Sequence, residues 1–164
     1  GDLAGQFGWF TKGNMYEGSV HVPLIIRDPD QKKSNGSRCS KNVNLIDLYK
    51  TILNRCGIDE KQKTHSRSLL GLLANPNNDN WQNETYSEFL HTDKWKNWMA
   101  VKDDYKIISA LGENNERLYE LYNISQSPLD NNDLSRDKDN QSLFNFMRDL
   151  LEEKIKWAAS LKVH

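Results

Sequence analysis

The chain has 164 residues and a mass of 19.1 kDa, which is enough for one hydrophobic core. Its 22 basic and 23 acidic residues give a formal net charge of -1. It therefore lacks the basic field that binding to nucleic acid or to an anionic membrane usually requires. Since no apolar run approaches the ~20 residues that span a bilayer, we expect neither a nucleic-acid nor a membrane partner.

Residues 1–18 form a glycine-rich stretch that holds the aromatic side chains Phe7, Trp9 and Phe10. This composition is typical of a structured loop whose aromatic residues anchor it to a core. Lys12 lies in the loop between small and polar residues. A lysine is a compact positive charge with three donors, suited to binding a tetrahedral oxyanion such as sulfate or phosphate. From its position alone, an ordinary solvated lysine is the alternative.

An apolar segment follows at residues 19–27 and ends at Asp28-Pro29. A short continuous apolar run of this kind predicts a strand that is buried on both faces, as in a parallel or mixed sheet. Residues 30–41 are polar and contain the turn signal Asn35-Gly36, so we expect an exposed loop there.

An amphipathic helix is predicted over residues 44–56, with Asn44 as its N-terminal cap and Gly57 just past its end. Its apolar side chains recur at helical spacing: Leu45, Tyr49, Ile52, Leu53 and Cys56. Residues 67–73 form a short apolar docking segment, and a polar loop follows. The change in composition near residue 80 marks the expected boundary between two parts of the chain.

The hydrophobic period changes to two from Glu84 onward, which predicts strands over residues 85–90, 98–102, 105–110 and 117–123. Asp103-Asp104 is expected to form a tight hairpin turn. After a polar connection, an apolar stripe predicts a long C-terminal helix that covers one face of this small antiparallel sheet. The stripe consists of Leu143, Met147, Leu150, Leu151, Ile155 and Ala158. The fold class is therefore α+β.

The N-terminal stretch GDLAGQFGWFTKGNMYEGSVHVPLIIRDP resembles the segment of sulfatases that follows their Asp-His-Gly or Asp-Asn-Gly metal motif. In that family a loop with the pattern (G/T)-K-G-x-x-Y-E-x-x-x-R-x-P leads into a core strand. Three further segments resemble sulfatase motifs in the same order: residues 44–58, 67–73 and 118–134. The chain is thus identified as the C-terminal part of a sulfatase-like, alkaline-phosphatase-like α/β enzyme.

This resemblance implies a role for Lys12, which matches the family lysine that contacts the sulfate group of the substrate. Tyr16 and Glu17 match the Y-E pair, and we expect them to position the loop. Residues 1–80 correspond to the end of the catalytic α/β domain, and residues 81–164 to a C-terminal subdomain. The implied substrate is a sulfated small molecule or carbohydrate, and the N-terminal part of the same protein is the implied partner.

The chain also departs from the family pattern. The sulfatase nucleophile is a formylglycine made from Cys or Ser in C/S-x-P-x-R, and no segment of the sequence fits that motif. The resemblance also implies a calcium ion held by acidic residues, which would come from outside these residues, so no metal ligand is predicted here. His21 stands where the family usually has Arg. We therefore expect this part alone not to hydrolyse sulfate esters.

His91 and Lys94 lie in a loop after a predicted strand. Because the C-terminal subdomain of sulfatases contributes loops to the rim of the substrate pocket, both are candidate substrate-binding residues, with an ordinary polar loop as the alternative. Trp95 and Trp98 are candidates for stacking on a sugar ring, although core packing is expected for at least one of them.

Two other functions stay open from the sequence. One is a phosphoester or phosphonate-ester hydrolase of the same superfamily, because Lys12 offers a charge and no geometry that separates sulfate from phosphate. The other is a non-catalytic binding module on this scaffold. The resemblance is compatible with a periplasmic or secreted protein, but the sequence itself does not indicate a compartment.

Overall fold

The computed structural model describes residues 1–31, 36–61, 64–92, 95–112 and 114–160. The chain forms two units, each described by itself. The sheet unit consists of Gly1–Pro23 and Tyr86–His164, and the helical unit consists of Leu24–Thr85. Among the described residues, no helix has the length and apolar character needed to cross a membrane. Where the domain boundary falls in the whole protein, predicted between residues 80 and 81, stays a prediction.

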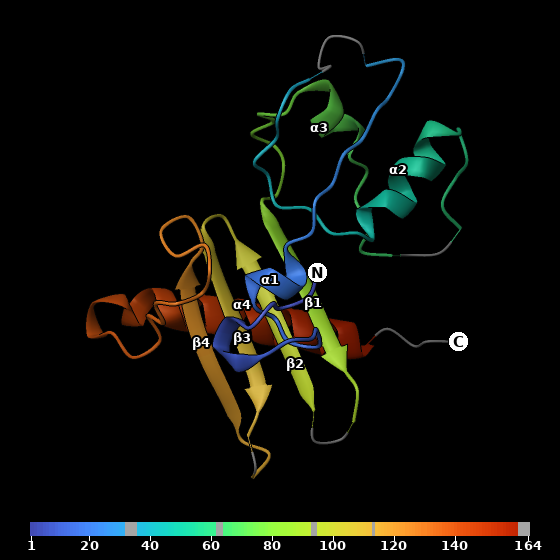
Figure 1. Cartoon of the computed structure of the whole chain (residues 1–164). Helices are drawn as coiled ribbons and strands as arrows, with labels where there is room; N and C mark the ends of the chain where they lie inside the picture. Colours follow the sequence, from blue (N-terminus) through green and yellow to red (C-terminus); the bar gives the residue numbers. More distant parts are fainter. Residues whose placement is uncertain (32–35, 62–63, 93–94, 113, 161–164) are drawn as a thin grey trace. The chain divides into compact units, whose positions relative to one another are not determined.

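The four predicted strands are present and form one sheet (Figure 1). They are β1 (Glu84–Leu90), β2 (Lys96–Lys102), β3 (Tyr105–Leu111) and β4 (Arg117–Asn123), in the order β1-β2-β3-β4. β2 and β3 pair antiparallel with Lys102 opposite Tyr105, and Asp103 adopts a left-handed φ of 51° in the turn between them. The predicted hairpin at Asp103-Asp104 is therefore confirmed.

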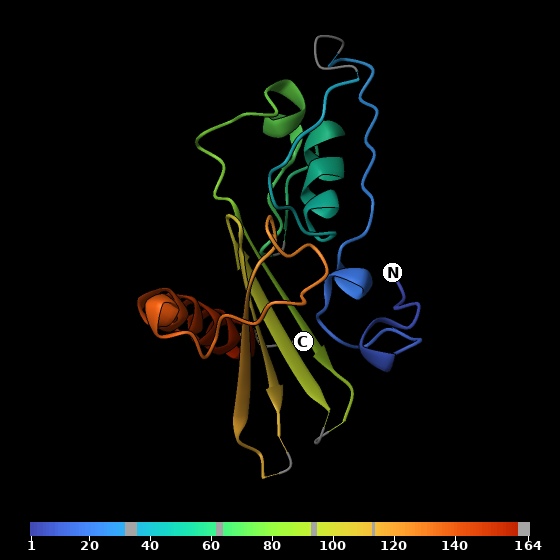
Figure 2. The same ribbon diagram turned by 60° about the vertical axis from the view of Figure 1, so that its left-hand side comes forward.

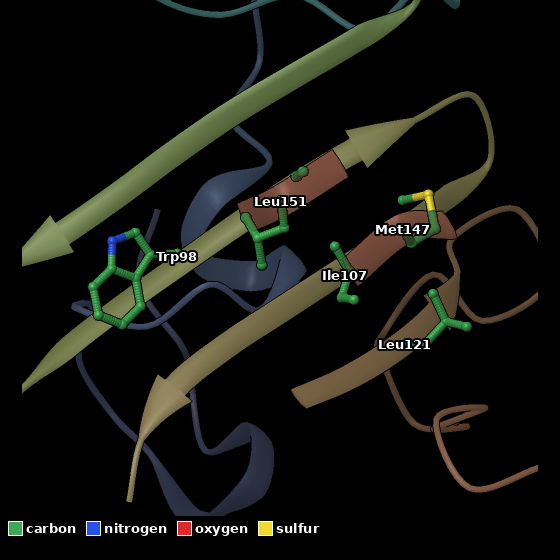
Figure 3. Close-up of a cluster of buried hydrophobic side chains, with 6 residues drawn as sticks. Trp98, Ile107, Leu121, Met147 and Leu151 are labelled. Carbon is green, nitrogen blue, oxygen red and sulfur yellow. The ribbon is translucent and has the colours of Figure 1, made fainter. Parts of the chain in front are cut away.

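The long C-terminal helix is confirmed as α4 (Gln141–Ser160), preceded by the 3₁₀ helix η3 (Lys138–Asn140). It covers one face of the sheet, where strand and helix side chains form a single buried cluster (Figure 3). This cluster consists of Trp98, Ala100, Ile107, Leu121, Met147 and Leu151. The alternation along β2 and β3 places every second residue against α4 and leaves the others for the opposite face.

The opposite face of the sheet is covered by the N-terminal segment, which lies across the sheet from α4 (Figure 2). This segment contains the 3₁₀ helix η1 (Gln6–Gly8) and the short helix α1 (Glu17–Val20). Met15 is its buried anchor in a second cluster with the strand residues Met99, Val101, Ile108 and Tyr122. The sheet is thus covered on both faces, and the loop that carries Lys12 belongs to its second covering layer.

The helical unit contains α2 (Asp47–Arg55) and α3 (Leu70–Ala74). The predicted helix is confirmed as α2, but Asn44 does not cap it with its side chain. Instead, the Asp47 carboxylate accepts from the backbone N–H of Asn44 at 2.9 Å. The buried residues of α2 are Asp47 and Thr51, whereas Leu45 and Ile52 of the predicted apolar face are exposed. The polar pair is buried because it bonds to residues 67 and 69 within this unit.

The predicted buried strand over residues 19–27 is wrong for the described chain. Its first residues belong to α1, and residues 21–28 have no strand assignment. Ile25, at the centre of the apolar run, is 93% exposed. A strand buried on both faces needs neighbouring strands on its edges and packing layers on its faces, and the described residues supply neither to this segment.

Candidate functional site

The segment before Lys12 forms a compact turn over the sheet. The backbone N–H of Leu3 donates to the Thr11 carbonyl at 3.1 Å, and that of Gly5 donates to the Trp9 carbonyl at 2.8 Å. Leu3 is itself buried. These contacts fix the chain on the N-terminal side of Lys12, so the backbone that carries the lysine has a defined position.

The backbone just after Lys12 is fixed as well. Gly13 has a φ of 100°, a conformation that favours glycine, and a Cβ atom there would lie 3.4 Å from the Phe89 ring. The Asn97 side-chain amide donates to the Gly13 carbonyl at 3.1 Å. Lys12 itself is exposed, and no hydrogen bond or ion pair joins its ammonium group to a described residue. The loop therefore presents a cation at the surface from a constrained backbone.

Tyr16 attaches the loop to β4. Its hydroxyl donates to Glu120 Oε1 at 3.2 Å, and the Tyr122 hydroxyl donates to Glu120 Oε2 at 2.9 Å. Burial, assisted by the Glu120 carboxylate, raises the pKa of both tyrosines. Both hydroxyls therefore remain protonated at neutral pH and hold the two carboxylate oxygens.

Glu17 attaches the loop to β3. Its Oε1 lies 2.8 Å from Lys106 Nζ, and its Oε2 lies 2.9 Å from His21 Nδ1. Lys106 also contacts Asp130, whose Oδ2 is 2.6 Å from the ammonium nitrogen. Burial raises the pKa of Asp130, and the Lys106 ammonium acts in the opposite direction. Tyr16 and Glu17 thus position the loop, as expected from their sequence pattern.

His91 lies beside the Lys12 loop. Its ring stacks on Phe89 with the centroids 5.8 Å apart, and it meets Trp95 edge-on at 6.2 Å. Trp95 in turn contacts Trp9, with 6.1 Å between the ring centroids. We call Trp9, Phe89, His91 and Trp95 the aromatic rim. Because Trp9 contacts Trp95 and a Cβ atom at Gly13 would lie 3.4 Å from Phe89, the structure brings the predicted His91 loop and the Lys12 loop together.

The remaining candidates for substrate contact are Lys94, Trp95 and Trp98. Lys94 lies outside the described residues, so its position is not assigned. Trp98 is only 6% exposed and packs against α4, with the Arg117 guanidinium 4.3 Å from its ring centroid. Trp95 is 41% exposed and Trp9 is 45% exposed. Trp95 is therefore available for ligand stacking, and core packing accounts for Trp98.

Sequence reasoning missed Trp9 as a rim residue and Lys106 as the anchor of Glu17. A signal for Trp9 was present, because an aromatic residue three positions before a candidate cation in a structured loop is placed near the same surface. The sequence contains no comparable signal for Lys106, since a lysine next to apolar residues in a strand is usually interpreted as facing solvent. Its partner Glu17 is 89 residues away in sequence.

An exposed cation beside aromatic faces can bind an anionic group attached to a ring, because the ammonium group pairs with the anion and the rings stack on the apolar face of the attached group. The described residues contain no group of three or more His, Cys, Asp or Glu side chains that fits a metal ion. Lys12 and the neighbouring rings therefore form a candidate anion-binding surface.

The sequence matches the family described as N-sulphoglucosamine sulphohydrolase, C-terminal, over residues 5–157. It is 33% identical over 135 residues to arylsulfatase K of Xenopus laevis, covering 78% of this chain and 25% of that protein. A solved structure in complex with its substrate D-glucosamine-2-N,6-O-disulfate matches with a TM-score of 0.80 and 25% identity, over 94% of this chain and 32% of that one.

Phosphonate monoester hydrolase of Agrobacterium radiobacter shares the fold, with a TM-score of 0.73 at 19% identity, over 90% of this chain and 32% of that chain. In each of these three comparisons the chain spans a third or less of the protein that it matches.

Proposed function

Because the chain belongs to the N-sulphoglucosamine sulphohydrolase C-terminal family, we propose that the whole protein hydrolyses sulfate monoesters and that this part supplies a sulfate-binding lysine. The observation that carries the proposal is the placement of Lys12. Lys12 is exposed, and its backbone is fixed on both sides by hydrogen bonds. Leu3 donates to the Thr11 carbonyl before it, and Asn97 donates to the Gly13 carbonyl after it. A fixed cation is ready to bind charge without reorganising during the reaction.

Lys12 acts in this proposal by pairing its ammonium group with the sulfate oxygens and stabilising the charge that develops as the S–O bond to the leaving group breaks. The sulfatase resemblance implies that calcium and formylglycine supply the metal and the nucleophile. The described residues do not form a metal site, and the sequence contains no C/S-x-P-x-R motif. In this proposal the residues of this chain hold the sulfate group and the substrate next to it.

We propose a sulfated carbohydrate as the substrate class, with the aromatic rim binding the sugar. Trp9 and Trp95 are both partly exposed, and their rings meet beside the Lys12 loop. A sugar presents C–H groups that pack on such rings while its sulfate reaches a cation. The sulfated glucosamine bound by the structurally similar protein supports this class. His91 and Lys94 are the proposed polar contacts of the same rim.

A direct test compares the turnover of an aryl sulfate and of the matching aryl phosphate by the whole protein. We expect a clear preference for the sulfate. The fold shared with a phosphonate monoester hydrolase makes the phosphorus esters the second candidate, because a single lysine charge accepts either anion. A preference for the phosphate would replace the sulfatase proposal with a phosphorus-ester hydrolase. The absence of turnover of both esters would favour a non-catalytic binding module.

The aromatic rim gives a separate prediction. We expect Trp9→Ala to raise the KM for a sulfated monosaccharide by up to about tenfold, because one aromatic contact contributes about 0.5–1.5 kcal/mol. The KM for a small alkyl sulfate without a ring is expected to stay unchanged. Phe10→Ala is the matched control, since Phe10 is an exposed neighbour outside the rim. Equal changes for both substrates would exclude ring stacking by Trp9.

A further inference from the structure

Lys106 is a buried cation near the start of β3. Its side chain is 0% exposed, and its ammonium nitrogen lies 2.8 Å from Glu17 Oε1 and 2.6 Å from Asp130 Oδ2. The Glu17 and Asp130 side chains are 12% and 0% exposed. Taking a lysine charge out of water is unfavourable unless it is paired and hydrogen-bonded, so these two carboxylates are what make the burial of Lys106 possible.

This cluster joins three separate segments of the sheet unit. Glu17 begins α1, five positions after Lys12, Lys106 belongs to β3, and Asp130 lies in the connection between β4 and η3. Asp130 Oδ2 also accepts the backbone N–H of Glu17 at 2.6 Å. The N-terminal segment is therefore bound at both the side chain and the backbone of one residue.

We propose that Lys106 is a positioning residue that clamps Glu17 and thereby fixes the Lys12 loop against the sheet. The consequence for turnover rests on the proposed function of Lys12, whereas the clamp itself does not. Without the Lys106 charge, Glu17 and Asp130 face the same space as two carboxylates with no cation between them. Two carboxylates that approach the same point repel, and Asp130 is fully buried while Glu17 is mostly buried.

Loss of the clamp is expected to open the N-terminal segment locally and to leave the main core intact. The cluster packed against α4, which contains Ile107 and Leu151, lies on the opposite face of the sheet from Lys106. Local opening exposes the peptide bond after Lys12, which is a trypsin site. Proteolysis of a locally opened segment follows the population of the open form when reclosing is fast.

The test is limited trypsin digestion of the whole protein, comparing Lys106→Met with the unaltered protein. We expect cleavage after Lys12 to become at least about tenfold faster, while cleavage after Arg148 in α4 remains close to its original rate. His21→Ala is the matched control. His21 contacts the other oxygen of Glu17 from the solvent side, and its removal leaves the clamp in place, so the cleavage rate after Lys12 should not change.

Glu17→Ala provides the test if Lys106→Met does not fold, because it leaves the Lys106–Asp130 pair intact. It is also expected to speed cleavage after Lys12. Unchanged cleavage in the folded variants would overturn the clamp. Turnover measured on the same samples tests a different point. Faster cleavage with unchanged kcat would keep the clamp and remove the Lys12 loop from the reaction, whereas faster cleavage with a lower kcat supports both proposals.

Discussion

Lys12→Ala should lower the turnover of a sulfate monoester by the whole protein by on the order of 10²-fold, comparable to the loss of one oxyanion-stabilising group. The lysine is exposed on a fixed backbone, so its removal takes away the charge proposed to bind the sulfate without removing a described contact that holds the fold. The measurement is kcat/KM with an aryl sulfate. An unchanged Tm is expected in parallel, because no described contact of the ammonium group is lost.

Lys138→Ala is the matched control for this experiment. Lys138 is also an exposed lysine of the sheet unit, located in η3, so its replacement changes the net charge by the same amount. If both variants lose the same activity, the effect is one of overall charge. If Lys12→Ala keeps the original kinetics, Lys12 does not belong to the site.

The distribution of the loss between kcat and KM identifies the step at which Lys12 acts. A lower kcat with little change in KM indicates an interaction made in the transition state, whereas a higher KM alone indicates that the lysine binds substrate and transition state equally. We expect the first pattern, since charge on the sulfate oxygens and leaving group changes most as the S–O bond breaks.

The sheet and α4 were predictable because their signals are local. Period-two alternation and the Asp103-Asp104 turn fix β2 and β3, and the apolar stripe fixes α4. The family was recognised from four colinear motifs, and the match over residues 5–157 confirms it. These elements can be predicted from their own residues and from the residues next to them in sequence.

The second covering layer of the sheet was not predictable in the same way. Met15 fills a cluster made by strands much later in the sequence, and Glu17 pairs with Lys106, a buried lysine 89 residues away. An apolar run in the sequence also does not show which residues pack against it. Ile25, at the centre of such a run, is exposed. Local patterns therefore give elements, whereas the placement of the Lys12 loop depends on pairings between distant residues.

The helical unit depends on one buried carboxylate in an equally non-local way. Asp47 Oδ2 accepts from the backbone N–H of Asn44 at 2.9 Å, and its Oδ1 accepts from that of Arg67 at 2.8 Å. The Arg67 guanidinium approaches the same carboxylate at 3.6 Å. Asp47 is 0% exposed, so both N–H groups would be left without this acceptor if the carboxylate were removed.

Asp47→Ala is therefore expected to destabilise the helical unit by about 3 kcal/mol, since each buried donor left unpaired costs about 1–3 kcal/mol and a broken buried ion pair costs more. Hydrogen exchange of the backbone amides of Arg67 and Leu69 is the measurement, because it reports opening of this unit within the whole protein. Exchange should become faster by on the order of 10²-fold.

Asp79→Ala is the control for this change, because Asp79 is an exposed carboxylate of the same unit and its loss should leave the exchange rate unchanged. Asp47→Asn should give an intermediate effect, since one oxygen acceptor remains while the charge beside Arg67 is lost. If protection at Arg67 and Leu69 survives in Asp47→Ala, the unit is held by its apolar contacts, of which Leu69 and Leu72 are the buried ones. Faster exchange limited to Asp47→Ala and Asp47→Asn would show that a polar contact joins α2 to the segment before α3.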